Sequence, residues 1–407
     1  MKANGPIVAL LSILLMAGCV EPEKPVQPEG NWHFVFNIGK ESIPFQAEII
    51  DEDGQLRFYA LNGKERIRAD EFELEKDSIF VRLPIFNTSL VGKIEGDRIV
   101  GQFQDHSRKG DYVIPFVATK GLRHRFPIVS EPNVDVNGSW KVEFSPGNDN
   151  AYLAIGQLKQ KGDTAFGTFL TNTGDYRYLG GNVSGDSLFL SCFDGSHVFL
   201  FKAKIRGNDI QGMFWSGNHW NENWSGTRDD NFELPDPTTL THLKPGYTEI
   251  DFSFKNLKGE TVSLKDARYA GKVVIVQIMG SWCPNCMDET AYLVSLYNKF
   301  NAQGLEVISL AFEKGDMPET NIRSLNRLKD HFSIPYEILL AGGASKTEAA
   351  AKLPMLNHVL SFPTGIYIDR KGKVRRIHTG FSGPGTGEYY QEFVEETDQF
   401  VTQLLLE

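Results

Sequence analysis

The spacing of apolar residues divides the chain into a β-rich first part and an α/β last part. Between residues 30 and 228, short runs rich in Val, Ile, Phe and Tyr alternate with Gly-Asp and Gly-Asn turn signals. This pattern predicts antiparallel strands that are joined by hairpins and close into small barrels or sandwiches. In residues 247–407, strand patterns alternate with helical ones, which predicts an α/β sandwich.

The β-rich part resembles two copies of one unit, residues 30–122 and residues 137–228. Gly30-Asn31-Trp32 opens the first copy and Gly138-Ser139-Trp140 opens the second, and later Asp-Ser-x-Phe stretches keep nearly the same offset. Such a period indicates duplication. We expect each opening tryptophan to plug the end of a barrel.

Aromatic residues gather near the end of the second copy, where Trp215, Trp220 and Trp224 stand among asparagines. Exposed aromatics interleaved with amides can line a ligand or sugar site. The alternative, which we favour, is that they seal the barrel or pack on the neighbouring domain. The proline-containing stretch 229–246 predicts a linker to the last domain.

The last domain opens with a hairpin pattern and then contains a nearly continuous apolar run, residues 273–279, which predicts a strand buried on both faces. Apolar residues then recur at helical spacing until Gly304, which predicts a helix. We expect the later elements to be a strand at residues 305–312, helices at 321–330 and 346–355, a hairpin at 364–378 and a final helix from about residue 388.

Between that strand and that helix lies Trp282-Cys283-Pro284-Asn285-Cys286. A Cys-x-x-Cys pair at a strand-to-helix junction is typical of a redox motif. Cys283 would lie at the helix N-terminus, where unpaired N–H groups and the macrodipole favour a thiolate. Cys286 would lie one turn further on, where it can attack a mixed disulfide formed at Cys283. The pattern predicts a redox-active disulfide between these two residues.

Such a pair can also belong to a zinc site or form a purely structural disulfide. A zinc site needs further ligands, but the chain has no second cysteine pair and its histidines lack ligand spacing. We therefore expect no metal and no cofactor beyond the redox-active disulfide. Cys192 is isolated and is expected to be a small buried residue, with a redox or pairing role as the alternative.

With these residues, the last domain resembles the thioredoxin superfamily, specifically the extracytoplasmic TlpA/ResA-like thiol–disulfide oxidoreductases. The resemblance rests on Gly271-Lys272-Val273-Val274-Ile275-Val276 and the Cys283–Cys286 motif, and covers about 160 residues. It implies that Phe362-Pro363-Thr364 is the cis-proline loop, which faces the disulfide and accepts a partner's backbone. On this basis, Trp282, Phe362 and Pro363 are expected to contact the substrate.

The resemblance also places Glu289 where ResA-like proteins carry an acidic residue that tunes the cysteine pKa. The alternative is an ordinary first-turn glutamate stabilised by the helix dipole. Gln277 stands where thioredoxins typically have a buried aspartate. Proton transfer from Cys286 must then use another group, either Glu289 or water. The Pro-Asn pair between the cysteines leaves the redox direction open, and the resemblance favours reduction.

The N-terminus predicts export and lipid anchoring. A short apolar run at residues 7–16 leads into Met16-Ala17-Gly18-Cys19, which resembles a bacterial lipoprotein signal. On this hypothesis, residues 1–18 are removed, Cys19 is lipidated, and residues 19–29 form an extended tether. The alternatives are an ordinary cleaved signal peptide and an uncleaved anchor. We expect the folded part to lie in the cell envelope and to face the periplasm.

The charge of the chain bears on its partners. A net charge of −10 without a basic run argues against nucleic acid. The resemblance instead implies three partners: disulfide-containing extracytoplasmic proteins, a membrane thiol donor, and the membrane through the lipid.

Three functions follow from the sequence. The leading hypothesis is a membrane-anchored thiol–disulfide oxidoreductase that reduces or exchanges disulfides. A peroxiredoxin-like peroxidase shares the fold, but residues 279–283 lack its Pro-x-x-x-Thr/Ser-x-x-Cys setting. In the third hypothesis, the β repeats carry the main function by binding a ligand or a protein.

Overall fold

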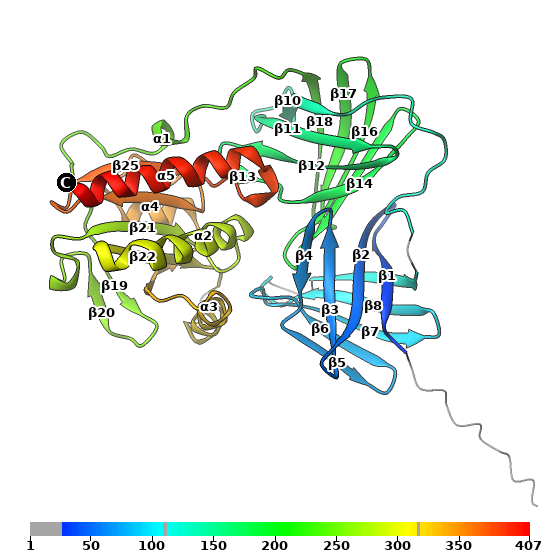
Figure 1. Ribbon diagram of the computed structural model, residues 1–407, viewed down its shortest axis with the longest axis horizontal. Helices are drawn as coiled ribbons and strands as arrows, with labels where there is room; N and C mark the ends of the chain where they lie inside the picture. Colours follow the sequence, from blue (N-terminus) through cyan, green and yellow to red (C-terminus); the bar gives the residue numbers. More distant parts are fainter. Residues whose placement is uncertain (1–26, 109–111, 122, 316–317) are drawn as a thin grey trace, which may run out of the picture.

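The computed structural model describes residues 27–108, 112–121, 123–315 and 318–407. Three sheets follow one another along this part of the chain (Figure 1). We call strands β1–β9 the first β unit, strands β10–β18 the second β unit, and everything after them the C-terminal part. Cys19 and the predicted signal segment lie outside the described residues.

The first β unit is a nine-stranded antiparallel sheet in which β1 pairs with both β2 and β9, and β4 and β5 form its two edges. Side chains alternate between the faces of a strand, so Phe34, Phe36 and Phe45 all point into the core and are fully buried. The strands are β1 (Gly30–Ile38), β2 (Glu41–Glu52), β3 (Gln55–Asn62), β4 (Glu65–Arg68), β5 (Glu71–Glu75), β6 (Ser78–Arg82), β7 (Thr88–Glu95), β8 (Arg98–Asp105) and β9 (Tyr112–Lys120).

The second β unit closes on itself, because β12 pairs with β11 as well as with β14. Trp140 Nε1 donates to Val136 O at 3.0 Å, and Trp32 in the first unit makes the equivalent bond to Pro28 O at 2.8 Å. The β-rich, barrel-like character is as predicted, and the duplication stays a prediction. The strands are β10 (Gly138–Phe144), β11 (Tyr152–Lys161), β12 (Thr164–Thr171), β13 (Gly174–Asp175), β14 (Leu179–Ser184), β15 (Ser187–Phe193), β16 (Val198–Arg206), β17 (Asp209–Ser216) and β18 (Trp220–Arg228).

The two β units share one core. Phe193, at the end of β15, packs its ring against both Phe36 and Phe45, with ring centroids 5.0 Å and 4.5 Å away. Phe193 and Leu200 are fully buried within the cluster formed by the first unit. The second unit therefore covers the side of the first sheet that its own strands leave open.

The C-terminal part is a seven-stranded mixed sheet with the order β20-β19-β23-β22-β21-β24-β25, in which β21, β22 and β23 run parallel. The strands are β19 (Ser253–Asn256), β20 (Thr261–Ser263), β21 (Val273–Met279), β22 (Leu305–Glu313), β23 (Glu337–Gly343), β24 (Thr364–Ile368) and β25 (Val374–Thr379). The helices are α1 (Pro237–Leu240), α2 (Pro284–Phe300), α3 (Pro318–Phe332), α4 (Lys346–Lys352) and α5 (Glu388–Leu406).

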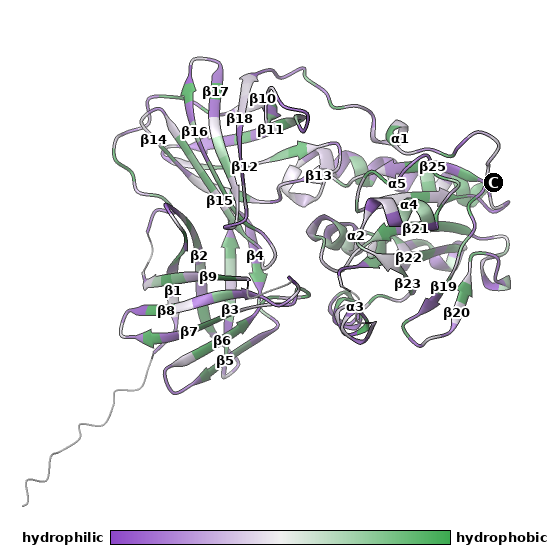
Figure 2. Ribbon diagram, turned by 180° about the vertical axis from the view of Figure 1, so that it is seen from behind, coloured by the Kyte–Doolittle hydropathy of each residue, from purple (hydrophilic) through white to green (hydrophobic). Residues whose placement is uncertain are grey.

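Both faces of this sheet are covered, which explains the apolar run of β21. Ile275 and Met279 face the cluster that contains α2, α3 and α5, whereas Val274 and Val276 face the cluster that contains α4. The central strands are accordingly largely hydrophobic in Figure 2. Gln277 shares the parity of Ile275, so it is a fully buried polar residue on the α2 side.

Candidate active site

The loop between β21 and α2 is held in one conformation. Trp282 Nε1 donates to Phe312 O at 2.8 Å, and a Cβ on Gly280 would lie 2.8 Å from the same oxygen, so only glycine fits there. The N–H and hydroxyl of Ser281 donate to the Glu313 carboxylate at 2.7 and 2.6 Å. The loop therefore presents the next residue, a cysteine, at a fixed position.

Cys283 and Cys286 form a disulfide, with Cα atoms 5.2 Å apart. Cys283 is the N-cap residue of α2, and its Sγ accepts a hydrogen bond from the Cys286 N–H at 3.2 Å. Cys286 is fully buried, whereas Cys283 is 5% exposed. Cys283 thus lies at the positive end of the helix dipole and is the more accessible sulfur, as a nucleophilic cysteine requires.

The Phe362-Pro363 loop faces this disulfide. The peptide bond between the two residues is cis, and Phe362 O lies 3.3 Å from Cys283 Sγ. The Phe362 ring packs edge-on against Trp282, with centroids 5.5 Å apart. The structure therefore brings together Trp282, Cys283, Phe362 and Pro363, which the sequence placed in one site.

Glu289 lies behind the disulfide and is buried to 2% exposure. Its carboxylate accepts a hydrogen bond from Gln277 Nε2 at 2.9 Å, and Gln277 Nε2 also lies 3.4 Å from Cys286 O. Burial raises the pKa of Glu289 to about 8, although the Gln277 hydrogen bond opposes this shift. At neutral pH this carboxyl group therefore holds a proton close to the buried cysteine.

A buried arginine joins both β units to the redox helix. Arg177, in the second unit, forms ion pairs with Glu65 of the first unit at 2.5 Å, with Asp194 at 3.2 Å and with Asp288 of α2. Burial lowers the pKa of Arg177, but Asp288, Glu65 and Asp194 outweigh this effect and raise it well above the usual value. The guanidinium stays charged and connects three parts of the chain beside α2.

A cavity of about 340 Å³ opens next to Trp282. Its walls come from the C-terminal part and from both β units, including Phe86 of the first and Ser196 of the second. Lys314 lies over the Trp282 ring, 4.7 Å from its centroid. Ile85, which also lines the cavity, belongs to the same buried cluster as Cys283. The β units therefore help to shape the approach to the disulfide.

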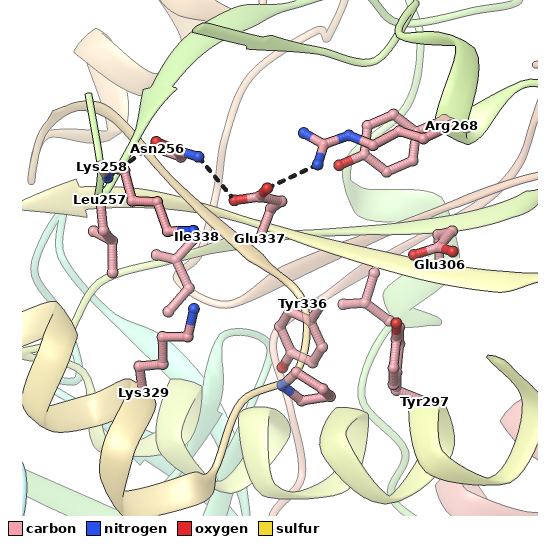
Figure 3. A pocket seen from close by; sticks show the side chains of 13 residues that line it. Asn256, Leu257, Lys258, Arg268, Tyr297, Glu306, Lys329, Tyr336, Glu337 and Ile338 are labelled. Atoms are coloured by element: carbon pink, nitrogen blue, oxygen red, sulfur yellow. Dashed lines mark hydrogen bonds and ion pairs between the residues drawn. The ribbon is translucent and has the colours of Figure 1, made fainter. Parts of the chain in front are cut away.

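A second pocket, of about 250 Å³, lies elsewhere in the C-terminal part (Figure 3). In it Glu337 accepts hydrogen bonds from Asn256 at 3.3 Å and from Arg268 at 2.8 Å. None of the residues predicted to form the site lines this pocket.

The remaining candidates do not join the site. Cys192 is fully buried, and no disulfide partner for it is found in the part of the chain described here. The tryptophans near the end of the second unit are dispersed: Trp224 is in the barrel core, Trp215 packs against the first unit's core, and Trp220 is 50% exposed.

Across the described ranges, no group of three or more His, Cys, Asp or Glu residues is arranged to hold a metal ion. Within the same residues, no helix has the length and apolar character needed to span a bilayer.

Comparisons with known proteins agree on the C-terminal part. A model of the AhpC/TSA family matches residues 245–377. The thiol-disulfide oxidoreductase ResA of Bacillus thuringiensis subsp. konkukian is 31% identical over 155 residues, which are 38% of this chain and 79% of that protein. ResA of Halalkalibacterium halodurans is 26% identical over 152 residues, 37% of this chain and 76% of that protein.

Among solved structures, a thiol:disulfide interchange protein from Chlorobium tepidum covers 39% of this chain and 95% of its own, with a TM-score of 0.30 and 19% identity. The chain belongs to the ResA-like thiol–disulfide oxidoreductases of the thioredoxin superfamily. It is accordingly a thiol–disulfide oxidoreductase with a thioredoxin fold at its C-terminus.

Arg177, Asp175 and Ile85 lie at the site without having been predicted from the sequence; Asp175 accepts a hydrogen bond from Asn285, between the two cysteines. Arg177 and Ile85 lie in loops of the β units and Asp175 lies in the two-residue strand β13, and no local pattern distinguishes them from ordinary turn residues. The periodicity of apolar residues and short motifs predict contacts within one helix or strand. The contacts of these residues instead join positions more than 100 residues apart, such as Arg177 and Asp288.

Proposed function

We propose that this protein reduces disulfides in extracytoplasmic proteins through Cys283 and Cys286. The Cys283 thiolate attacks one sulfur of the substrate disulfide, the substrate S–S bond breaks, and one substrate thiolate leaves. Cys286, once deprotonated, attacks Cys283 Sγ and breaks the mixed disulfide, which releases the second substrate thiolate. Two electrons pass to the substrate, and the Cys283–Cys286 disulfide remains. The observation that carries this proposal is the cysteine pair at the amino end of α2, opposite the Phe362-Pro363 loop.

The different environments of the two sulfurs support their different roles. Cys283 accepts the Cys286 N–H and lies at the helix end, where negative charge is stabilised. Cys286 has no exposed surface, so a large substrate cannot reach it directly. Its natural target is therefore Cys283 Sγ in the mixed disulfide, whose substrate sulfur then leaves.

Glu289 and Gln277 are proposed to handle the proton of Cys286. A carboxyl group with a pKa of about 8 exchanges a proton readily near neutral pH. Gln277 bridges the Glu289 carboxylate and the Cys286 carbonyl, so it orients the carboxyl group toward this turn of the helix. In this chain, the pair replaces the buried aspartate of other thioredoxins.

The substrate is proposed to lie between Trp282 and the Phe362-Pro363 loop. The cavity of about 340 Å³ beside Trp282 gives a polypeptide segment access from this side. Pro363 cannot donate a backbone hydrogen bond, so the backbone contact that the family resemblance implies would come from Phe362.

The location and the electron source are part of the same proposal. Lipidated Cys19 would tether the protein to a membrane of the cell envelope, with the catalytic site facing the periplasm. A membrane thiol donor would return Cys283 and Cys286 to the dithiol after each turnover. The resemblance to TlpA/ResA-like proteins supports both points.

Insulin reduction tests the activity. The reduced full chain should reduce insulin disulfides, and Cys283→Ser should abolish the reaction. Cys286→Ala should instead accumulate a mixed disulfide on Cys283, which identifies the natural substrates when expressed in the source cell. Cys192→Ala is the matched control and should behave like the wild type. Full insulin reduction by Cys283→Ser would contradict the proposal.

A ligand-binding role of the second β unit has one observation in its favour. An open pocket of about 400 Å³ is lined by aromatic side chains that include Tyr152, Tyr176 and Trp220. Glu222 lies on its wall and accepts a hydrogen bond from Tyr152 at 2.9 Å. Binding of small glycans to the full chain, measured by calorimetry with Trp220→Ala as the comparison, tests this role.

A further inference from the structure

The segment of the second β unit that contains Thr173 and Asp175 lies directly against the redox site. Ser361 Oγ, next to the Phe362-Pro363 loop, donates to Thr173 O at 2.7 Å. Gly380, at φ +77°, faces the same residue so closely that a Cβ there would lie 2.9 Å from Thr173 C. The second β unit therefore contacts the C-terminal part at the edge of its catalytic loop.

Within this segment, Asp175 reaches the Cys-x-x-Cys motif itself. It is 7% exposed, and its Oδ2 accepts hydrogen bonds from Asn285 Nδ2 at 3.0 Å and from the Gly383 N–H at 2.6 Å. Its Oδ1 accepts from the Arg177 N–H at 2.6 Å. Asn285 is one of the two residues between the cysteines, so a carboxylate from outside the thioredoxin fold touches the motif.

The neighbouring charged groups do not neutralise the negative charge of the Asp175 carboxylate. Asp288, on the next turn of α2, adds a second negative charge, and the nearby Arg177 is already shared among Asp288, Glu65 and Asp194. Burial and Asp288 raise the pKa of Asp175 to about 6, against the opposing effects of the Gly383 N–H and Arg177. The carboxylate is therefore ionised in neutral and mildly alkaline solution.

We propose that Asp175 is a positioning residue of the redox centre: it orients Asn285, places a negative charge beside the amino end of α2, and thereby makes the Cys283–Cys286 pair more strongly reducing. This inference rests on the proposed function and assigns a residue that favours its reducing direction. A neighbouring carboxylate opposes formation of the Cys283 thiolate. The dithiol form is then less stable relative to the disulfide and gives up its electrons more readily.

The redox equilibrium with glutathione measures this effect. The Cys283–Cys286 disulfide takes up two electrons and two protons from two glutathione thiols, which join as one glutathione disulfide. Asp175→Asn in the full chain should favour the dithiol. At about pH 8 we expect the equilibrium constant for reduction to rise roughly fivefold to tenfold, because a neighbouring unit charge shifts a thiol pKa by about one unit.

The Cys283 pKa is the second readout, since a merely structural role would not move it. In reduced Asp175→Asn, the thiolate absorbance of Cys283 should appear about one pH unit lower than in the wild type. Asp186→Asn is the matched control, because Asp186 belongs to the same β unit, its side chain is 42% exposed, and it pairs with Lys204. Its equilibrium constant and its thiolate titration should equal those of the wild type.

The proposal is overturned if folded Asp175→Asn keeps the glutathione equilibrium of the wild type within about twofold, or if its Cys283 pKa does not fall. An asparagine has only one acceptor for the donors of Arg177 and Gly383, which flank both oxygens. Should this variant not fold, Asp175→Ser replaces it under the same criteria. Insulin reduction by Cys283→Ser would defeat the proposed function, whereas a wild-type equilibrium in an active Asp175 variant would defeat this inference alone.

Discussion

Glu289→Gln tests whether the buried carboxyl group behind the disulfide is protonated. The side chain has the same shape and can still accept the hydrogen bond from Gln277, but it cannot ionise. Glu289 is 2% exposed, and burial raises its pKa from 4.5 to about 8. The substitution therefore removes one ionisation and leaves the packing largely intact.

The raised pKa predicts how stability depends on pH. The folded state holds the Glu289 proton more tightly than the unfolded chain does, so the full contribution to stability is present below pH 4.5 and is lost as the pH rises through about 8. Two-state linkage gives a loss of about 3.5 kcal/mol between about pH 5 and about pH 8. In Glu289→Gln this loss should be absent.

Native-state hydrogen exchange of amides in β21 and α2 measures the free energy of opening around Glu289. In the oxidised wild type we expect this free energy to fall with rising pH, and in Glu289→Gln to fall by about 3.5 kcal/mol less between about pH 5 and about pH 8, which makes the variant the more stable protein above neutral pH. Glu395→Gln, an exposed glutamate on α5, is the control and should follow the wild type. An equal pH dependence in wild type and Glu289→Gln would refute the reasoning. Insulin reduction by Glu289→Gln should also slow by about tenfold or more, because glutamine cannot exchange a proton with Cys286.

Three further substitutions give distinct results. Arg177→Met removes the cation between buried carboxylates such as Asp194 and should destabilise the folded chain by about 3–5 kcal/mol, measured by thermal unfolding. Gly380→Ala should lower the stability by about 1 kcal/mol or more, since φ is +77° and a Cβ would contact the Thr173 backbone; an unchanged melting temperature would contradict the close packing. Cys192→Ala should reduce insulin at the wild-type rate, and a large loss would assign Cys192 a redox role.

The sequence predicted the parts of the site that depend on local pattern. The buried strand, the cysteine pair and the helix follow one another in the chain, so apolar periodicity and the Cys-x-x-Cys spacing were enough to predict their arrangement, and the thioredoxin fold is confirmed. Phe362-Pro363 was placed opposite the cysteines by family resemblance alone, because no local rule connects residues that far apart. β23 was missed, since its apolar run is short and ends in two glycines.

Contacts between the units could not be predicted in this way. Three contacts join separate parts of the fold. They are the packing of the Phe193 ring in the core of the first unit, the ion pairs of Arg177, and the hydrogen bond between Asp175 and Asn285. Each depends on how preformed units pack, and packing leaves no periodic signal in either segment. Arg177 forms ion pairs with three carboxylates, yet in the sequence it looks like an ordinary arginine in a turn.

The most direct test of the central claim is the pH dependence of alkylation at Cys283 in the reduced protein. Iodoacetamide reacts with the thiolate, so its rate follows ionisation. A sulfur at the amino end of α2 should titrate clearly below the value of about 8.5 for a free cysteine. A midpoint at or above that value, with no reversible disulfide to Cys286, would contradict the account.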